Sequence, residues 1–227
     1  MSDAIETLLA TARLWRGAGA SPVASADASA GNTARHVPSG HGGLDTLLPG
    51  GGWPECGLIE LLLDQHGIGE LQIVMSLLRG PGANAMAAAE TDTRWIAWLA
   101  PPFLPYAPAL REEGLALERQ LIVRTLQAKE VWWAMEQVLR SGACRAVLGW
   151  ASAAEGHAVR RLKLAAEQGG SAGLLFRPTR YRSQASSANV RAALRGSAAG
   201  LEIEIFKAQG GRTGRTRVSA SGLGVIG

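Results

Sequence analysis

The residues from Asp64 to Glu70, DQHGIGE, have the spacing of a phosphate-binding glycine loop but not its chemistry. An apolar run that predicts a buried strand precedes the loop, and a helical pattern follows it. A working P-loop, G-x-x-x-x-G-K-[ST], surrounds phosphates with backbone N–H groups, holds them with a lysine and places a hydroxyl on Mg²⁺. Gly67 and Gly69 are present here, whereas Glu70 and Leu71 stand in place of the lysine and the hydroxyl.

No shift of the alignment supplies the missing lysine, because the first 128 residues contain none. A carboxylate at Glu70 would occupy the positive end of the helix itself. At about 4 Å from a triphosphate oxygen it would add roughly 4 kcal/mol of repulsion at an effective dielectric constant of 20. From the loop alone, an ordinary strand-to-helix turn is an equal alternative to a degenerate nucleotide loop. The degenerate loop, with no bound cofactor, would consist of Asp64, Gln65, His66, Gly67, Ile68, Gly69 and Glu70.

A more specific pattern surrounds this loop. Its residues are Ser39, Gly40, Leu44, Asp45, PGGGWP at 49–54 and IELLLDQHGIGEL at 59–71. The pattern resembles the opening of the RecA superfamily core, and it is most similar to the ImuA family of translesion-synthesis accessory proteins and its SulA-like relatives. The resemblance implies an α/β fold with a RecA-like core, in which helices flank a mostly parallel sheet with an antiparallel edge hairpin and a degenerate P-loop.

Three further positions differ from those of a RecA-type ATPase. The strand WIAWLA at 95–100 leads into PPFLPYAPAL instead of a water-activating acid. The strand at 146–150 ends in Trp150, where the resemblance implies the metal-ordering aspartate of a Walker B motif. The strand at 171–177 leads to Pro178 and Thr179 instead of a polar phosphate sensor. The chain is therefore expected to be a pseudo-ATPase and not an enzyme.

The ImuA resemblance also implies a function, that of a non-catalytic adaptor in SOS-induced translesion DNA synthesis. The implied partners are an ImuB-like inactive Y-family polymerase homologue, RecA and, through them, an error-prone polymerase. Two alternatives stay open. One is a cell-division inhibitor like SulA, which caps a cytoskeletal GTPase, and the other is a divergent DNA-dependent ATPase.

Positive charge is concentrated near the C-terminal end. Residues 177–217 hold nine Lys/Arg and two Glu, a net of +7, and the remaining fourteen Lys/Arg and seventeen Asp/Glu give −3, so the whole chain is +4. Such a region attracts DNA or an acidic protein, although a merely solvated arginine-rich surface has the same composition. Two adjacent tryptophans are also candidates for partner contact. On one helix they point about 100° apart, so one of them can reach the surface. The contact candidates are Arg177, Arg180, Arg182, Arg212, Arg215, Arg217, Trp132 and Trp133.

Metal, disulfide and membrane features are not indicated. The histidines have no ligand-like spacing, and Cys56 and Cys144 form no framework, so we expect no metal and two reduced thiols. No apolar run reaches the ~18 residues of a membrane span, and the N-terminus lacks the order of a signal peptide. A cytoplasmic location is expected.

The pattern along the chain predicts three regions. Residues 1–36 should form a short helix (3–17) and a flexible linker, 37–207 the α/β domain, and 208–227 a basic disordered tail. Alternating strands and helices indicate a parallel sheet covered by helices. The strands expected are 58–63, 94–100, 121–123, 146–150 and 171–177, and the helices are 70–78, 105–113, 128–141 and 153–168. Residues 189–194 and 201–207 should form the edge hairpin, an edge through which the protein could self-associate.

Overall fold

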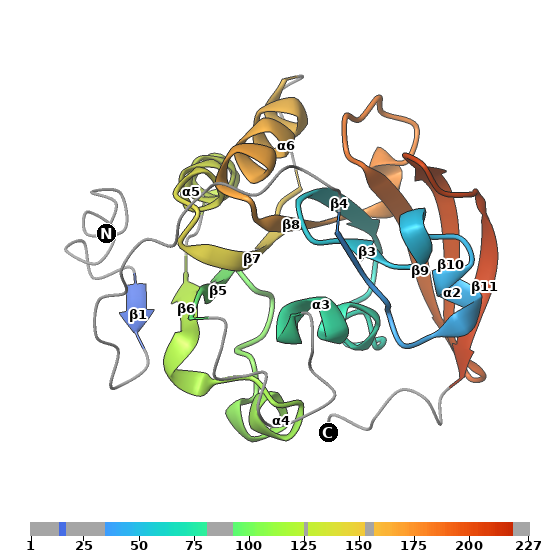
Figure 1. The fold of residues 1–227 in the computed structure, drawn as a ribbon, viewed down its shortest axis with the longest axis horizontal. Coiled ribbons are helices and arrows are strands. Elements are labelled where there is room, and N and C mark those ends of the chain that lie inside the picture. The colour runs from blue at the N-terminus through green and yellow to red at the C-terminus, as the bar shows by residue number, and fades with distance from the viewer. Residues whose placement is uncertain (1–13, 17–34, 81–92, 125–126, 153–156, 220–227) are drawn as a thin grey trace.

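A single sheet organises the computed structural model, which describes residues 14–16, 35–80, 93–124, 127–152 and 157–219 of the chain. Its nine strands lie in the order β1-β6-β5-β7-β8-β4-β9-β10-β11 (Figure 1). The strands from β6 to β9 run parallel to one another, and the strands at the two margins are antiparallel to their neighbours. The sheet is therefore mixed.

The central strands are nearly continuous runs of buried residues, as expected where helices cover both faces of a sheet. Each begins and ends within two residues of a strand that the sequence predicted, so these five predictions are confirmed. They are β4 (Gly57–Leu62), β5 (Trp95–Leu99), β6 (Gln120–Val123), β7 (Cys144–Trp150) and β8 (Ala172–Arg177).

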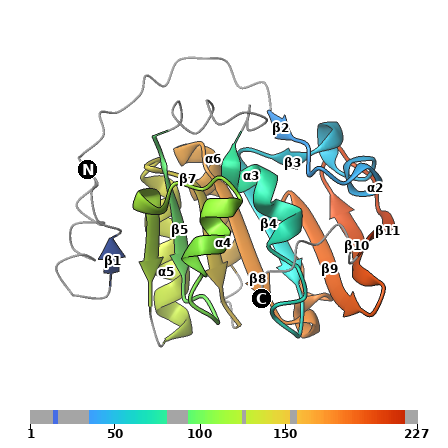
Figure 2. The same ribbon diagram turned by 90° about the horizontal axis from the view of Figure 1, so that it is seen from below.

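Two pairs of helices cover opposite faces of this central part. Figure 1 shows α5 (Ala128–Arg140) and α6 (Ala158–Gly169) above the sheet, and α3 (Met75–Arg79) and α4 (Ala107–Glu112) below it. Two apolar clusters fill the spaces between helices and sheet, one on each face. Figure 2 views the sheet from the side of α3 and α4, with β1 and β11 at opposite margins.

The predicted edge hairpin is present. β9 (Val190–Ser197) pairs antiparallel with β10 (Gly200–Ala208), and a further strand, β11 (Gly214–Ser219), pairs with β10. The prediction of a disordered tail from residue 208 is therefore wrong as far as Ser219. The low apolar content of this segment was a poor guide, because β11 is held by backbone pairing with β10 and by cross-strand ion pairs instead of by large apolar side chains. Residues 220–227 lie outside the described part.

The N-terminal prediction also fails where it can be examined. Leu14–Arg16 form the short strand β1, antiparallel to β6, instead of the end of a helix. The margin of β6 offers unpaired backbone groups, and pairing with them competes with a short isolated helix. The rest of the predicted helix and most of the linker lie outside the described residues.

A small layer built from residues 35–54 covers β10 and β11 on the face that carries α3. It consists of β2 (His36–Val37), α2 (Gly42–Asp45), a 3-10 turn (Pro49–Gly51) and β3 (Trp53–Pro54). Trp53 is fully buried and donates its indole N–H to the Ile73 carbonyl at 2.6 Å, which ties this layer to the segment leading into α3. The opposite face of β9–β11 has no α-helix on it within the described part of the chain (Figure 1), and a 3-10 turn (Thr179–Tyr181) lies beside β9.

Candidate functional site

The glycine loop after β4 is held closed by its own side chain. The carboxylate of Glu70 is 5% exposed and accepts the backbone N–H groups of Gly67 at 3.0 Å and Ile68 at 2.9 Å. These are the loop amides that a phosphate would need. At the start of the loop, Asp64 accepts the N–H of Thr179 at 2.9 Å and also its hydroxyl. These hydrogen bonds lower the pKa of Asp64 and tie the loop to the end of β8.

The helix that follows this loop also differs from that of a P-loop. The segment after Glu70 is a turn and then a 3-10 helix (Gln72–Val74), and α3 begins only at Met75 and ends after five residues. A phosphate site needs a helix whose first N–H groups point into the loop. Gln65 and His66 are exposed and do not complete such a site. The loop is a structural turn whose amides Glu70 occupies, as its carboxylate at this position predicted.

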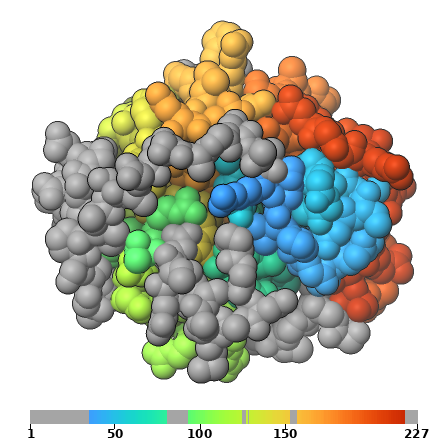
Figure 3. Space-filling view, in the orientation of Figure 1, coloured from blue at the N-terminus to red at the C-terminus, as the bar shows by residue number. Residues whose placement is uncertain are grey.

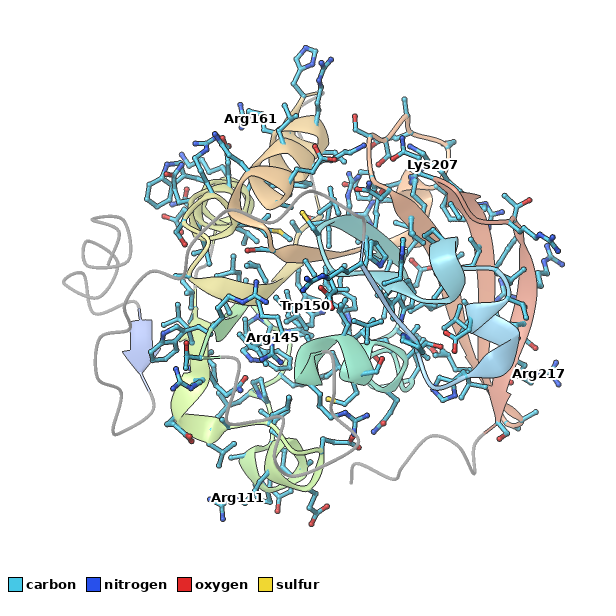
Figure 4. The ribbon with its side chains drawn as sticks, in the orientation of Figure 1. Arg111, Arg145, Trp150, Arg161, Lys207 and Arg217 are labelled. Carbon is cyan, nitrogen blue, oxygen red and sulfur yellow. The ribbon has the colours of Figure 1, made fainter. Side chains whose placement is uncertain are left out.

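Trp150, expected at a lost Walker B position, is a packing residue. Its ring stacks on Trp98 with centroids 6.3 Å apart and on Phe176 with centroids 4.6 Å apart. Figure 4 shows it in the interior, between the sheet and α3. The aromatic stack fills the space at the end of β7 without contributing a catalytic group.

The arginine candidates fall into separate environments. Arg177 is 1% exposed at its side chain and donates to Glu60 at 2.8 Å, so it belongs to the core and not to a surface. Arg182 and Arg217 line an open groove of about 1100 Å³ on the face of β9–β11 opposite α2. Arg215 lines the same groove, and so does Arg195, which sequence reasoning did not select although it alternates with buried residues on β9. The exposed Arg180 and Arg212 do not line it.

The two tryptophans of α5 point in different directions, as their adjacent positions predict. Trp132 is 6% exposed and packs in the cluster beneath α5 and α6, whereas Trp133 is 48% exposed. Trp133 therefore stays a contact candidate, and Trp132 does not.

A surface that sequence reasoning missed lies at the end of β5. Phe103, Leu104 and Tyr106 are 68%, 72% and 59% exposed, on the loop between β5 and α4. Large apolar side chains that gather on one loop are typical of protein-binding sites. The sequence does contain part of the signal: Phe103 and Leu104 lie among prolines, between the predicted strand at 94–100 and the predicted helix at 105–113.

The backbone of this loop is fixed by its own sequence. Ala100 has φ +50°, and among the described residues it is the only non-glycine residue with a positive φ. Its N–H donates to the Val123 carbonyl at 2.8 Å, which holds the turn in place. Prolines at 101, 102 and 105 restrict φ beyond it. The apolar side chains are thus presented on a loop with little freedom to lose on binding.

Other chemistry is scarce in this structure. The described residues include no group of three or more His, Cys, Asp or Glu side chains arranged to hold a metal ion. Cys56 and Cys144 are free thiols, and burial raises the pKa of Cys144 to about 12, which makes it a poor nucleophile. Nor is any helix within the described ranges long and apolar enough to span a bilayer.

Comparison with known proteins identifies the relatives of the chain. The family model of the cell division inhibitor SulA matches residues 70–173. The cell division inhibitor SulA of Edwardsiella piscicida is 33% identical over 146 residues, which span 64% of this chain and 83% of that protein. The chain belongs to the SulA family. SulA of Photorhabdus laumondii is 30% identical over 123 residues, covering 54% of this chain and 65% of that protein. The crystal structure of SulA from Pseudomonas aeruginosa is 26% identical and covers 53% of this chain and 97% of that one, with a TM-score of 0.40.

SulA membership corrects the interpretation drawn from the opening motif. The assignment to ImuA and to a RecA-like core is wrong, because both the family model and the curated relatives are SulA, and the structure is a mixed sheet flanked by helices. The adaptor role in translesion synthesis is wrong too, as are its ImuB-like, RecA and polymerase partners. The SulA-like alternative is the better supported one.

The prediction that the chain is not an enzyme agrees with the SulA family, which is one of inhibitors. The idea of a pseudo-ATPase has no support, since it rested on the glycine loop and on Trp150. The matched range, 70–173, contains the exposed apolar loop and the helices α3 to α6, whereas β9–β11 lie beyond it.

Proposed function

We propose that this chain inhibits cell division by binding a protein of the division machinery through the loop at 101–106. The observation that carries the proposal is the exposure of Phe103, Leu104 and Tyr106 within the range that matches the SulA model. The proposed partner is FtsZ, the filament-forming GTPase. Because FtsZ is a protein of the cytoplasm, the chain would act there.

The energetics suit a small contact of high affinity. Fully burying a side chain such as Phe or Leu contributes about 1.5 to 3 kcal/mol. The prolines and the fixed turn at Ala100 reduce the entropy lost when the loop is ordered on a partner, and preorganisation of this kind raises affinity. Phe103 and Leu104 would act as the central anchors, with Tyr106 beside them.

The test uses the full chain and purified FtsZ. Light scattering follows FtsZ assembly after GTP is added, while the double variant Phe103→Ala/Leu104→Ala is compared with the unchanged protein. We expect the unchanged protein to suppress assembly and the double variant to need at least about thirtyfold more protein for the same effect, because a hot-spot pair contributes about 2 kcal/mol or more.

Leu164→Ala is the matched control, since Leu164 is also an exposed leucine, 53% accessible, but lies on α6 across the sheet. It should inhibit like the unchanged protein. Thermal unfolding of all three proteins checks that each is folded. Failure of the unchanged protein to affect assembly would refute the proposed function, and full inhibition by the double variant would refute the assigned loop.

A further inference from the structure

The groove face of β9–β11 carries an alternating pattern of charge across its strands. Arg195 on β9 lies opposite Glu202 on β10, and Glu202 lies opposite Arg217 on β11. One step along, Glu204 on β10 lies opposite Arg215 on β11. Read outward from β9, the signs are positive, negative and positive. Figure 3 shows these strands in orange to red along one margin of the surface.

Ion pairs connect β10 to β11 on this face. Arg217 donates to Glu202 at 2.9 Å, and Arg215 reaches Glu204 at 3.4 Å. Arg182, from the loop after β8, adds a two-pronged contact to Glu204 with both distances at 2.8 Å. These bonds lower the pKa of Glu204 to about 2, so the carboxylate keeps its charge over the physiological range.

Positive charge is nevertheless in excess. Arg195 makes no hydrogen bond or close ion pair among the described residues, although its charge interacts with that of Asp64 in the same groove. The side chain of Arg215 is 80% exposed and that of Arg217 is 55% exposed. Figure 4 shows Arg217 projecting from the margin of the molecule. Each arginine of β11 can therefore bind a second carboxylate on the side away from β10.

β11 is also an open edge. In the part of the chain that the structure describes, residues 214–218 pair with β10 alone, so their backbone groups on the outer side can receive another strand. On the face opposite the groove it lies against α2, where Gly42 and Gly43 are exposed and have no side chains. A Cβ at Gly43 would lie 2.4 Å from the Thr216 hydroxyl, so any other residue there would force the Thr216 side chain to move.

We propose that β11 is a docking edge for an extended, acidic segment of a partner protein. The segment adds a tenth strand to the sheet, and carboxylates at alternate positions continue the charge alternation by meeting Arg215 and Arg217. Backbone hydrogen bonds provide affinity in this mode of recognition, and the alternating side chains provide specificity. The edge lies beyond residues 70–173, which match the SulA model, and on a different element from the loop at 101–106.

Two other occupants fit the charges less well. A second copy of β11 paired antiparallel would set arginine opposite arginine, and like charges directly opposite one another destabilise a sheet. A nucleic acid would bring phosphates close to Glu202 and Glu204, whose carboxylates line the groove. An acidic peptide can place its charges only where the arginines are.

The experiment is fluorescence anisotropy with synthetic seven-residue peptides at low ionic strength. The first probe alternates valine and glutamate, and the second has the same composition with its glutamates in one block. We expect the alternating peptide to bind about tenfold tighter than the block peptide, because only alternation combines strand pairing with both ion pairs. Hydrogen exchange should show new protection at residues 214–218 when the alternating peptide is bound.

The charge-reversed protein Arg215→Glu/Arg217→Glu should no longer bind the alternating acidic peptide and should bind a peptide that alternates valine and lysine. Arg212→Glu is the control, since Arg212 is an exposed arginine just before β11 that does not line the groove, and it should bind as the unchanged protein does. The proposal is overturned by equal binding of the two acidic peptides, by tighter binding of a thymidine oligonucleotide, or by self-association through β11 without peptide binding. If the peptides do not bind but the protein still inhibits FtsZ assembly, the proposed docking edge at β11 is overturned and the proposed function is not.

Discussion

One face of the sheet is divided into two halves of opposite character. Under α5 and α6, the strands β5, β7 and β8 present apolar side chains, and Leu139, Leu162 and Leu175 are fully buried there. Past β4 the helices stop, and β9–β11 present arginine and glutamate to solvent on the same face. The opposite face of β9–β11 remains apolar, with Leu201, Ile203 and Ile205 in the core. The difference shows that helix cover, and not strand pairing, determines where this sheet becomes polar.

A buried ion cluster marks the boundary between the two halves. Glu60 on β4 is fully buried and accepts from Arg177 at 2.8 Å and from Arg191 at 2.6 Å. Arg191 also donates to the carbonyls of Tyr181, Arg182 and Gln184, so it fixes the loop that carries Arg182 over the groove. A single carboxylate thus connects the helix-covered core to the charged face.

The largest effect is expected at this boundary. Glu60→Gln removes the negative charge and leaves two buried guanidinium groups uncompensated, which should cost about 3 to 5 kcal/mol of unfolding free energy. Urea unfolding of the full chain measures the loss. A loss of unfolding free energy below about 1 kcal/mol, the range of exposed ion pairs, would mean that the Glu60 cluster contributes no more than the pairs on the charged surface.

A smaller effect is expected in the helix-covered half. Gly169, at the end of α6, lies so close to α5 that a Cβ would fall 1.9 Å from the Leu139 carbonyl oxygen. Gly169→Ala should therefore force the two helices apart and cost about 1 to 3 kcal/mol, as overpacking does. Gly42→Ala is the control, because nothing lies within 4 Å of its Cβ position. Equal unfolding midpoints for the two variants would contradict this close approach.

The smallest effect is expected on the charged face. Glu204→Gln loses its pairs with Arg182 and Arg215, but exposed pairs contribute only about 0 to 1 kcal/mol. Because folding lowers the pKa of Glu204 to about 2 from an ordinary value of 4.5, its stabilisation is present above pH 4.5. It is lost as the pH falls toward 2.

Urea unfolding at pH 6 and at pH 2 checks this dependence. The difference between Glu204→Gln and the unchanged protein should shrink at the lower pH and also in high salt, which screens exposed charges. If the two proteins differ in unfolding free energy by the same amount under all three conditions, packing and not charge determines the contribution of Glu204.

The sequence predicted the helix-covered half better than the charged half. Apolar runs such as Leu58–Leu63 identify buried strands directly, because both faces of each strand are covered. The strand β11 reads GRTRVS, with one large apolar residue, and nothing local shows that Glu202 and Glu204 lie opposite its arginines. That information is non-local, so composition predicted a tail.

The candidate surface was predicted less well than the fold. The glycine loop attracted attention because strand, glycine turn and helix follow one another in many α/β proteins, yet Glu70 satisfies the loop amides itself. Arg177 was selected by its charge, but its partner Glu60 is 117 residues away and buries it. Phe103 and Leu104 were passed over although they lie among prolines between a predicted strand and a predicted helix, because their exposure depends on the absence of neighbours in the folded structure.

The two margins of the sheet are unequal, and this limits how the protein can assemble. β1 is three residues long and β11 is six. A filament built by adding sheet to sheet needs two adhesive margins on every subunit, and within the described residues only β11 is long enough to serve. Among the described strands, addition through β11 alone therefore joins two partners and does not continue into a fibre.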